Sequence, residues 1–174
     1  MKKRPNYGPM ASKKKNTSKS GLISTNQTVA DNRRAGFEYA LEDRYVAGLV
    51  LVGTEVKSLR LGQCSLQEAY IGPKEDALYL LNAHIPEYMQ AGHHLQHEPK
   101  RPRKLLLHKR ESNKLLGAVQ REGYTIIPIK LYFDDKGRAK LELAIGKGKK
   151  LHDKRETEKK RDWQKQKSRI MREH

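Results

Sequence analysis

The chain has 174 residues, with 37 Lys and Arg against 20 Asp and Glu, and a formal net charge of +17. This length suits one domain with tails, and the excess of positive charge favours an anionic partner, nucleic acid first. No apolar run is long enough to span a membrane, and the N-terminus lacks the apolar core of a signal peptide. One cysteine, Cys64, excludes an internal disulfide and any multi-cysteine zinc site. We therefore expect a cytoplasmic protein without a membrane partner.

The positive charge is concentrated at the two ends of the chain. Residues 1–20 carry a net charge of +7 and residues 147–174 another +7, whereas residues 21–146 carry +3. Charged segments without apolar periodicity are typical of flexible tails. We therefore expect a flexible basic N-terminal arm over residues 1–30, a folded body over residues 31–147 and a basic C-terminal tail over residues 148–174.

The apolar pattern between the tails predicts a mainly β protein with helices. Strands are expected at residues 36–42, 47–53, 68–72, 77–85, 125–133 and 140–146. Residues 54–62 suit a short helix or turn, and apolar residues on one helical face predict a longer helix over residues 104–123. Five or six short strands with one main helix favour a small OB-like β-barrel, a fold that often binds nucleic acid.

The sequence offers little support for catalysis. His93, His94 and His97 are close together, but no fitting carboxylate or cysteine set accompanies them, so an exposed polar loop is favoured over a zinc site. Cys64 has no recognisable partner signature and is interpreted as structural. There is no phosphate-cradling loop and no clear acid/base pair. We expect a protein that is not an enzyme and that has no cofactor and no metal site.

A basic segment, RPRK from Arg101 to Lys104, is more informative because Lys and Arg neutralise phosphates. Its alternative interpretation is a solvated loop. Tyrosines in the expected strands, such as Tyr79 and Tyr132, could stack on bases, although each is more often part of a half-buried core.

Several motifs are similar to those of one known family. They are NRRA from Asn32, AGLVLVGTEVKSLRLG from Ala47, RPRKLLLHKRE from Arg101, REGYTIIPIKLYF from Arg121 and GKGKKLHDKRE from Gly146. Together, in this order and at matching intervals, they resemble the SsrA-binding proteins, also called small protein B, which are the partners of transfer-messenger RNA. The resemblance runs from about residue 32 to residue 171.

The resemblance implies an OB-like barrel that binds the tRNA-like domain of transfer-messenger RNA. It also implies delivery of that RNA to 70S ribosomes stalled on broken messages, where trans-translation tags the unfinished peptide. One monomer per transfer-messenger RNA is expected. For RNA binding the resemblance points to Asn32, Arg33, Lys57, Arg60, Asn82, Arg101, Arg103, Lys104, Lys140, Lys147, Lys149 and Lys150.

The C-terminal tail has a separate implied role, in the decoding centre of 16S rRNA and the empty mRNA channel. The residues implied for it are Gly148, His152, Asp153, Lys154, Arg155, Trp163, Ile170 and Met171. In the family this tail is disordered in isolation and becomes helical on the ribosome. Asp153 and Glu156 have the spacing of a capping box, which would start that helix with Asp153 as its N-cap.

Two features depart from the family pattern. Val46 stands where the family commonly has an acidic residue, and the N-terminal arm is longer than expected. Two other function classes remain as alternatives, and the first of them shares the charge and the fold. One is a general OB-type RNA-binding or ribosome-associated protein without a dedicated RNA partner. The other is an RNA-modifying or RNA-cleaving enzyme, which would need a catalytic site.

Overall fold

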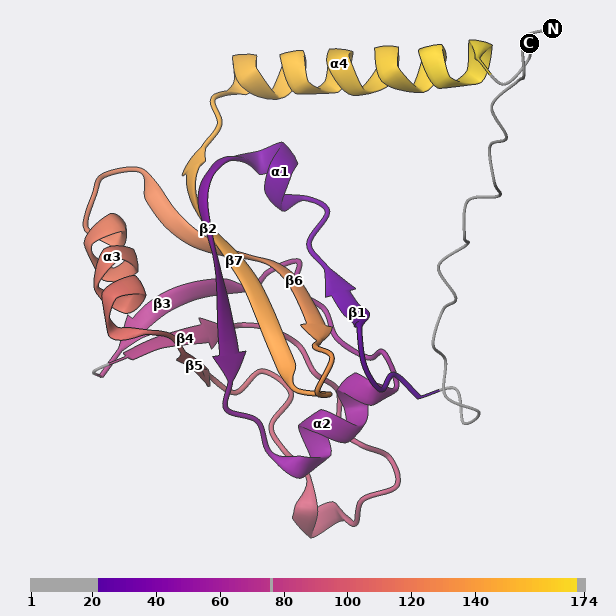
Figure 1. The fold of residues 1–174 in the computed structure, drawn as a ribbon, viewed down its shortest axis with the longest axis vertical. Helices are drawn as coiled ribbons and strands as arrows, with labels where there is room; N and C mark the ends of the chain where they lie inside the picture. The colour runs from indigo at the N-terminus through magenta and orange to yellow at the C-terminus, as the bar shows by residue number, and fades with distance from the viewer. Residues whose placement is uncertain (1–21, 76, 172–174) are drawn as a thin grey trace, which may run out of the picture.

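The computed structural model describes residues 22–75 and 77–171, so most of the expected N-terminal arm lies outside the described residues. Figure 1 shows a curved sheet with helices at its ends and one side. The strands are β1 (Gln27–Asp31), β2 (Tyr39–Leu49), β3 (Tyr70–Lys74), β4 (Ala77–Leu81), β5 (Arg103–Leu106), β6 (Tyr124–Phe133) and β7 (Ala139–Gly148). The helices are α1 (Ala35–Glu38), α2 (Gly53–Arg60), the 3₁₀ turn η1 (His93–Leu95), α3 (Lys109–Val119) and α4 (Leu151–Ile170).

The strands form one antiparallel sheet that closes on itself. Its order is β1-β6-β3-β4-β5-β2-β7, and an additional pairing of β6 with β7 joins the two sides. Closure leaves few open strand edges and creates an enclosed interior. The expectation of a mainly β protein with helices is therefore confirmed.

Apolar side chains from the strands fill this interior, and two helices contribute to it. Leu59 of α2 and Leu115 of α3 are fully buried within the same cluster as Ile126, Leu131 and Leu141. In Figure 1, α2 lies at one end of the barrel and α3 lies beside β3, β4 and β5. The two helices therefore cover openings that the strands alone would leave exposed to water.

Three expected elements differ from the structure. Residues 36–42 and 47–53 are expected as two strands, but in the structure α1 is followed by one long strand, β2. The pairing of β2 with β7 shifts register between Leu41 and Arg44, so the strand continues through the charged residues Glu42 and Asp43. The expected helix over 104–123 is wrong at its start, because β5 pairs there with β2 and β4. Residues 27–30, expected in the flexible arm, belong to β1 and pair with β6.

The C-terminal tail forms the helix α4, which begins at Leu151 and ends at Ile170. Figure 1 shows α4 extending beyond the barrel as one long helix. Asp153 is expected as the N-cap residue, but it lies inside the first turn of α4. Its carboxylate accepts a hydrogen bond from the Lys150 N–H, just before the helix, at 3.3 Å. That contact satisfies one N–H that the helix itself leaves without a partner.

Gly146 of β7 lies where β2, β6 and β7 pack too closely to leave room for a side chain. A Cβ at this position would lie 2.5 Å from the Ile127 Cδ1 and 3.2 Å from the Tyr39 Cβ, whereas a Cβ at Gly148 would meet nothing within 4 Å. We predict that Gly146→Ala lowers the free energy of unfolding by about 1 kcal/mol, because the buried Ile127 side chain must change rotamer and the Tyr39 Cβ, next to the backbone of β2, must also shift. Chemical denaturation measures this, with Gly148→Ala as the matched control. Equal stability of the two variants would contradict the packing described.

Candidate nucleic-acid interface

A surface groove of about 590 Å³ lies between the outer face of the barrel and the start of α3. Two apolar side chains in it are unusually exposed: Val46 of β2 at 49% and Leu106 of β5 at 56%. Lys104 and Lys140, both expected to bind RNA, also line it. The groove thus combines cations that can neutralise phosphates with an apolar surface that can contact the face of a base or ribose.

Strand register explains how these side chains meet. Gly48 of β2 pairs with Leu106 on one side and with Lys140 on the other. A Cβ at Gly48 would lie 3.3 Å from the Leu106 Cβ, so the missing side chain leaves room for the leucine. On the next strand, Tyr79 is the cross-strand partner of Lys104, and its ring centre lies 5.9 Å from the Lys74 ammonium. Neighbouring strands therefore assemble a surface from residues far apart in the sequence.

Val46 occupies the position where an acidic residue was anticipated from the family resemblance. Its cross-strand partner on β7 is Glu142, and the Glu142 carboxylate accepts a hydrogen bond from Arg44 at 2.9 Å. An acid therefore does stand beside this position, on the neighbouring strand, and it is ion-paired. The groove itself presents an apolar surface at residue 46.

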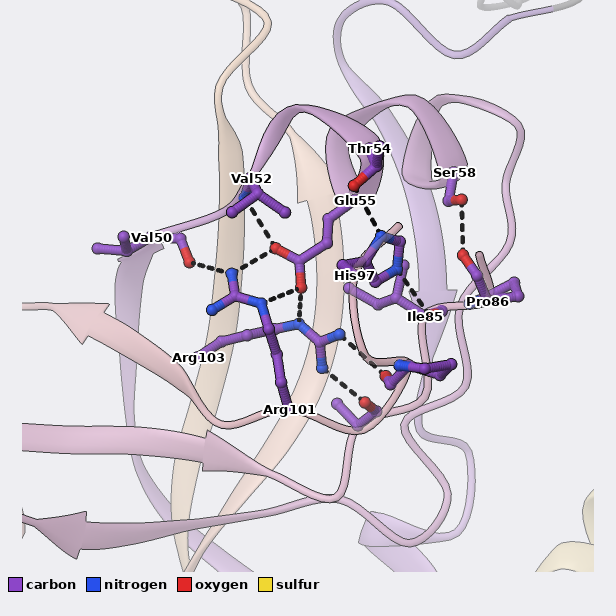
Figure 2. Close-up of polar contacts among 12 residues, drawn as sticks. Val50, Val52, Thr54, Glu55, Ser58, Ile85, Pro86, His97, Arg101 and Arg103 are labelled. Atoms are coloured by element: carbon purple, nitrogen blue, oxygen red, sulfur yellow. Dashed lines mark hydrogen bonds and ion pairs between the residues drawn. The ribbon is translucent and has the colours of Figure 1, made fainter. Parts of the chain in front are cut away.

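Glu55 of α2 organises the segment that precedes Lys104, as Figure 2 shows. Arg101 donates to both carboxylate oxygens, at 2.8 and 2.6 Å, and the Arg103 Nε–H donates to one of them at 2.7 Å. The Val52 N–H, at the start of α2, donates to the other oxygen at 2.9 Å. One buried carboxylate thus joins the first turn of α2 to the connection between β4 and β5.

The charges in this cluster are well compensated. Burial alone raises the pKa of Glu55, but hydrogen bonds from Arg101, Val52 and Arg103 outweigh it, so the pKa lies below its ordinary value of 4.5. The same hydrogen bond raises the pKa of Arg101. The guanidinium of Arg103 also donates to the carbonyls of Ala83 and Pro99, at 2.7 and 2.9 Å. Buried charges are stable only with such partners.

The expectation that Arg103 contacts RNA is therefore wrong, because its side chain is 0% exposed and donates inward to three partners. Arg101 is 27% exposed and ion-paired with Glu55. Since side chains alternate along a strand, Lys104 points to the opposite face of β5 and reaches the groove. The sequence shows that RPRK is basic, but it does not show that Arg101 and Arg103 form ion pairs with Glu55.

Three other expected RNA contacts mainly support the backbone. Asn32 is buried, and its side-chain N–H donates to the Pro128 carbonyl at 3.1 Å. Arg60 donates to the Ile23 carbonyl at 3.1 Å and lies over the Phe133 ring. Asn82 adopts a left-handed backbone with φ of 57° and donates to the Glu68 carbonyl.

Arg33 and Lys57 are exposed, in contrast. The Lys57 ammonium lies 5.3 Å from the centre of the Tyr88 ring. These two residues lie outside the groove that holds Lys104 and Lys140, so the structure does not bring all expected RNA-binding residues to one surface.

Three lysines surround the point where β7 leads into α4. Lys147 is exposed, with its ammonium 5.5 Å from the centre of the Tyr124 ring. Lys149 is half-buried and bonded to α1, and Lys150 is exposed. Gly148 is the last residue of β7.

In α4 the structure describes exposed side chains at Asp153, Arg155 and Trp163, and Met171, just after the helix, is also exposed. The Lys167 ammonium lies 5.4 Å from the centre of the Trp163 ring. The side chains of His152, Lys154 and Ile170 lie outside what the structure describes.

The histidine segment needs one correction. His97 is 6% exposed and not part of an exposed loop: its ring nitrogens contact the Thr54 hydroxyl at 2.8 Å and the Ile85 carbonyl at 3.0 Å. Within residues 22–75 and 77–171, no group of three His, Cys, Asp or Glu is placed to hold a metal ion. Nor does that part of the chain contain a helix long and apolar enough to cross a bilayer.

We predict that Glu55→Ala lowers the free energy of unfolding by about 3–5 kcal/mol, because it leaves two guanidinium groups without their carboxylate. Glu68→Ala is the matched control, since that carboxylate is 76% exposed and lies 3.8 Å from Lys100; its loss should cost no more than about 1 kcal/mol. Urea denaturation of both variants measures the difference. A small effect at Glu55 would contradict its organising role.

The pH dependence of stability in the wild type and in Glu55→Ala tests the lowered pKa of Glu55. Because the folded-state pKa of Glu55 lies below 4.5, the unfolded chain takes up this proton first. The stabilisation is complete above about pH 4.5 and is lost as pH falls through the folded pKa. The wild type should therefore lose stability more steeply than Glu55→Ala below that pH, and parallel pH profiles would refute the lowered pKa.

Comparison with known proteins identifies the family of this chain. Residues 29–173 match the family model of the SmpB protein. An SsrA-binding protein of Methylobacterium sp. (strain 4-46) is 60% identical over 146 residues, covering 84% of this chain and 92% of the relative. An SsrA-binding protein of Rhodopseudomonas palustris (strain BisB18) is 58% identical over the same length and with the same coverage.

One solved structure extends the comparison to three dimensions. It is described as "tmRNA-SmpB: a journey to the center of the bacterial ribosome" and has 42% sequence identity to this chain and a TM-score of 0.60. The match covers 70% of this chain and 85% of the solved one. The chain described here therefore belongs to the SmpB protein family.

Proposed function

We propose that this chain binds transfer-messenger RNA and acts with it in trans-translation on the bacterial ribosome. Relatives of 58–60% identity are SsrA-binding proteins, and a structure with 42% identity holds SmpB with tmRNA in a ribosome context. The structural observation that carries the proposal is the groove beside α3, where Lys104 and Lys140 flank exposed apolar side chains. This combination suits a folded RNA that offers both phosphates and unpaired bases.

The proposed mechanism divides the work between two parts of the chain. The barrel, including its groove, holds the tRNA-like domain, with Arg33 and Lys57 as further exposed cations. The tail from residue 148 enters the decoding centre and the empty mRNA channel, where phosphates of 16S rRNA would meet its many basic residues. Its small apolar set, Trp163, Ile170 and Met171, is the proposed anchor in that channel.

Each transfer-messenger RNA is proposed to take one copy of the protein, in the bacterial cytoplasm where ribosomes work. The protein acts by binding and placement, and the peptide-tagging chemistry belongs to the ribosome. The charged part of the N-terminal arm, residues 1–20, is proposed as a further, non-specific RNA contact, because seven of its residues are Lys or Arg and none is acidic.

The groove is tested by the salt dependence of binding. We predict that Lys104→Ala combined with Lys140→Ala weakens binding to a transfer-messenger RNA transcript. It should also reduce the slope of log Kd against log salt by about 1.4–1.8, since each phosphate contact contributes about 0.7–0.9. Filter binding at several salt concentrations measures this, and Lys136→Ala, an exposed lysine in the β6–β7 turn, is the control. An unchanged slope would remove the groove from the interface.

The division between barrel and tail is tested separately. Replacing Asp153, Lys154 and Arg155 together by Ala should leave the affinity for transfer-messenger RNA unchanged and abolish peptide tagging in a reconstituted translation system. Circular dichroism should accompany the assay, because the Asp153 carboxylate also supports the first turn of α4. Equal loss of RNA binding and tagging would contradict the division.

A further inference from the structure

Lys149 contacts α1 with both of its nitrogens. Its backbone N–H donates to the Glu38 carbonyl at 2.9 Å, and its ammonium donates to the Gly36 carbonyl at 2.9 Å. The last carbonyls of a helix have no partner within that helix, and a positive charge is favoured near its C-terminal end. Lys149, which follows β7, therefore caps a helix that lies more than a hundred residues earlier in the chain.

The short helix that receives Lys149 is itself fixed to the barrel. Just before it, the Asn32 N–H donates to the Ile129 carbonyl at 2.8 Å, and the Asn32 side chain donates to the Pro128 carbonyl. The Ala35 N–H then donates to the Asn32 carbonyl at 3.2 Å. Because β6 holds Asn32 and Asn32 holds the start of α1, Lys149 is tied to a fixed part of the barrel.

Very little chain separates this attachment from the tail. Lys150 is the one residue between Lys149 and α4, which begins at Leu151, and its N–H already donates to the Asp153 carboxylate. Figure 1 shows α4 starting next to α1. With a single intervening residue, the direction in which α4 leaves the barrel depends strongly on how Lys149 is held.

We infer that Lys149 is a positioning residue that sets the direction of the tail relative to the RNA-binding barrel, and that its ammonium serves α1 instead of an RNA phosphate. Its neighbours differ: Lys147 and Lys150 are exposed, whereas Lys149 is half-buried. The three lysines therefore have separate roles, although the sequence places them together as RNA contacts. This positioning role goes beyond the proposed function and does not depend on it, except in the measurement that uses transfer-messenger RNA.

A distance measurement on the full chain tests the inference without RNA. Spin labels on cysteines introduced at Lys114 of α3 and Gln164 of α4, both exposed, report the direction of the tail. The native Cys64, which is partly exposed, is replaced by Ser in every labelled protein, so that the label reacts with the introduced cysteines alone. We expect a narrow distance distribution that broadens in Lys149→Met, stays narrow in Lys150→Met and is restored by Lys149→Arg. Equal distributions for Lys149→Met and Lys150→Met would overturn the inference.

The salt dependence of RNA binding shows whether the Lys149 ammonium positions the tail or contacts a phosphate. Lys149→Met should keep the salt dependence of transfer-messenger RNA binding, whereas Lys140→Met should reduce the slope by about 0.7–0.9. Peptide tagging should fall in Lys149→Met at unchanged RNA affinity. A reduced slope for Lys149→Met would show that its ammonium contacts phosphate and would also overturn the inference. If Lys140→Met alone kept the full slope, the proposed groove would fail, while the distance measurement would still decide the role of Lys149.

Discussion

A single buried carboxylate, that of Glu55, accepts hydrogen bonds from two guanidinium groups and from the backbone that begins α2. Isolated buried charges are very costly, so Glu55 and Arg103 are stable in the interior only while they are together. Their pairing fixes α2 against the β4–β5 connection and sets which side chains of β5 point inward. Lys104 reaches the groove because Arg103, one residue earlier, is held inside.

The position of the proposed RNA-binding groove therefore depends on an ion-pair cluster whose residues do not line the groove. Arg103 is completed by the carbonyls of Ala83 and Pro99, so the cluster also holds the long loop that precedes β5. At the opposite end of the barrel, a smaller polar assembly around α1 joins β6 to the start of the tail. Buried or half-buried polar contacts at the two ends thus determine where the groove and the tail lie on the closed sheet.

Much of the fold is predictable because its strongest patterns are local. The alternating residues of β6 and β7 and the short loop between them predict a hairpin, and the structure contains it. The start of the expected helix over 104–123 could not be predicted from local pattern, since Leu105 and Leu106 suit a helix or a strand. The pairing of β5 with β2 and β4 decides it, and that is a contact between distant segments.

The candidate site shows the same limit. Composition and the family resemblance led to Lys104 and Lys140, which do share a groove, but they also led to Arg103, which is buried. Charge in a sequence does not show which way a side chain points, and the acid that turns Arg103 inward is 48 residues away in the sequence. Leu106 was not recognised as part of the site, because it was expected in a helix, and Val46 was noted only as a departure from the family pattern.

The most direct test of the account is to capture the protein from its own cells under conditions that preserve complexes and to sequence the RNA that comes with it. The account predicts one dominant RNA that has a tRNA-like end and an internal reading frame, together with 16S rRNA from ribosomes. A broad spread of messenger and ribosomal fragments, with no such RNA enriched, would contradict it and would favour a general RNA-binding protein.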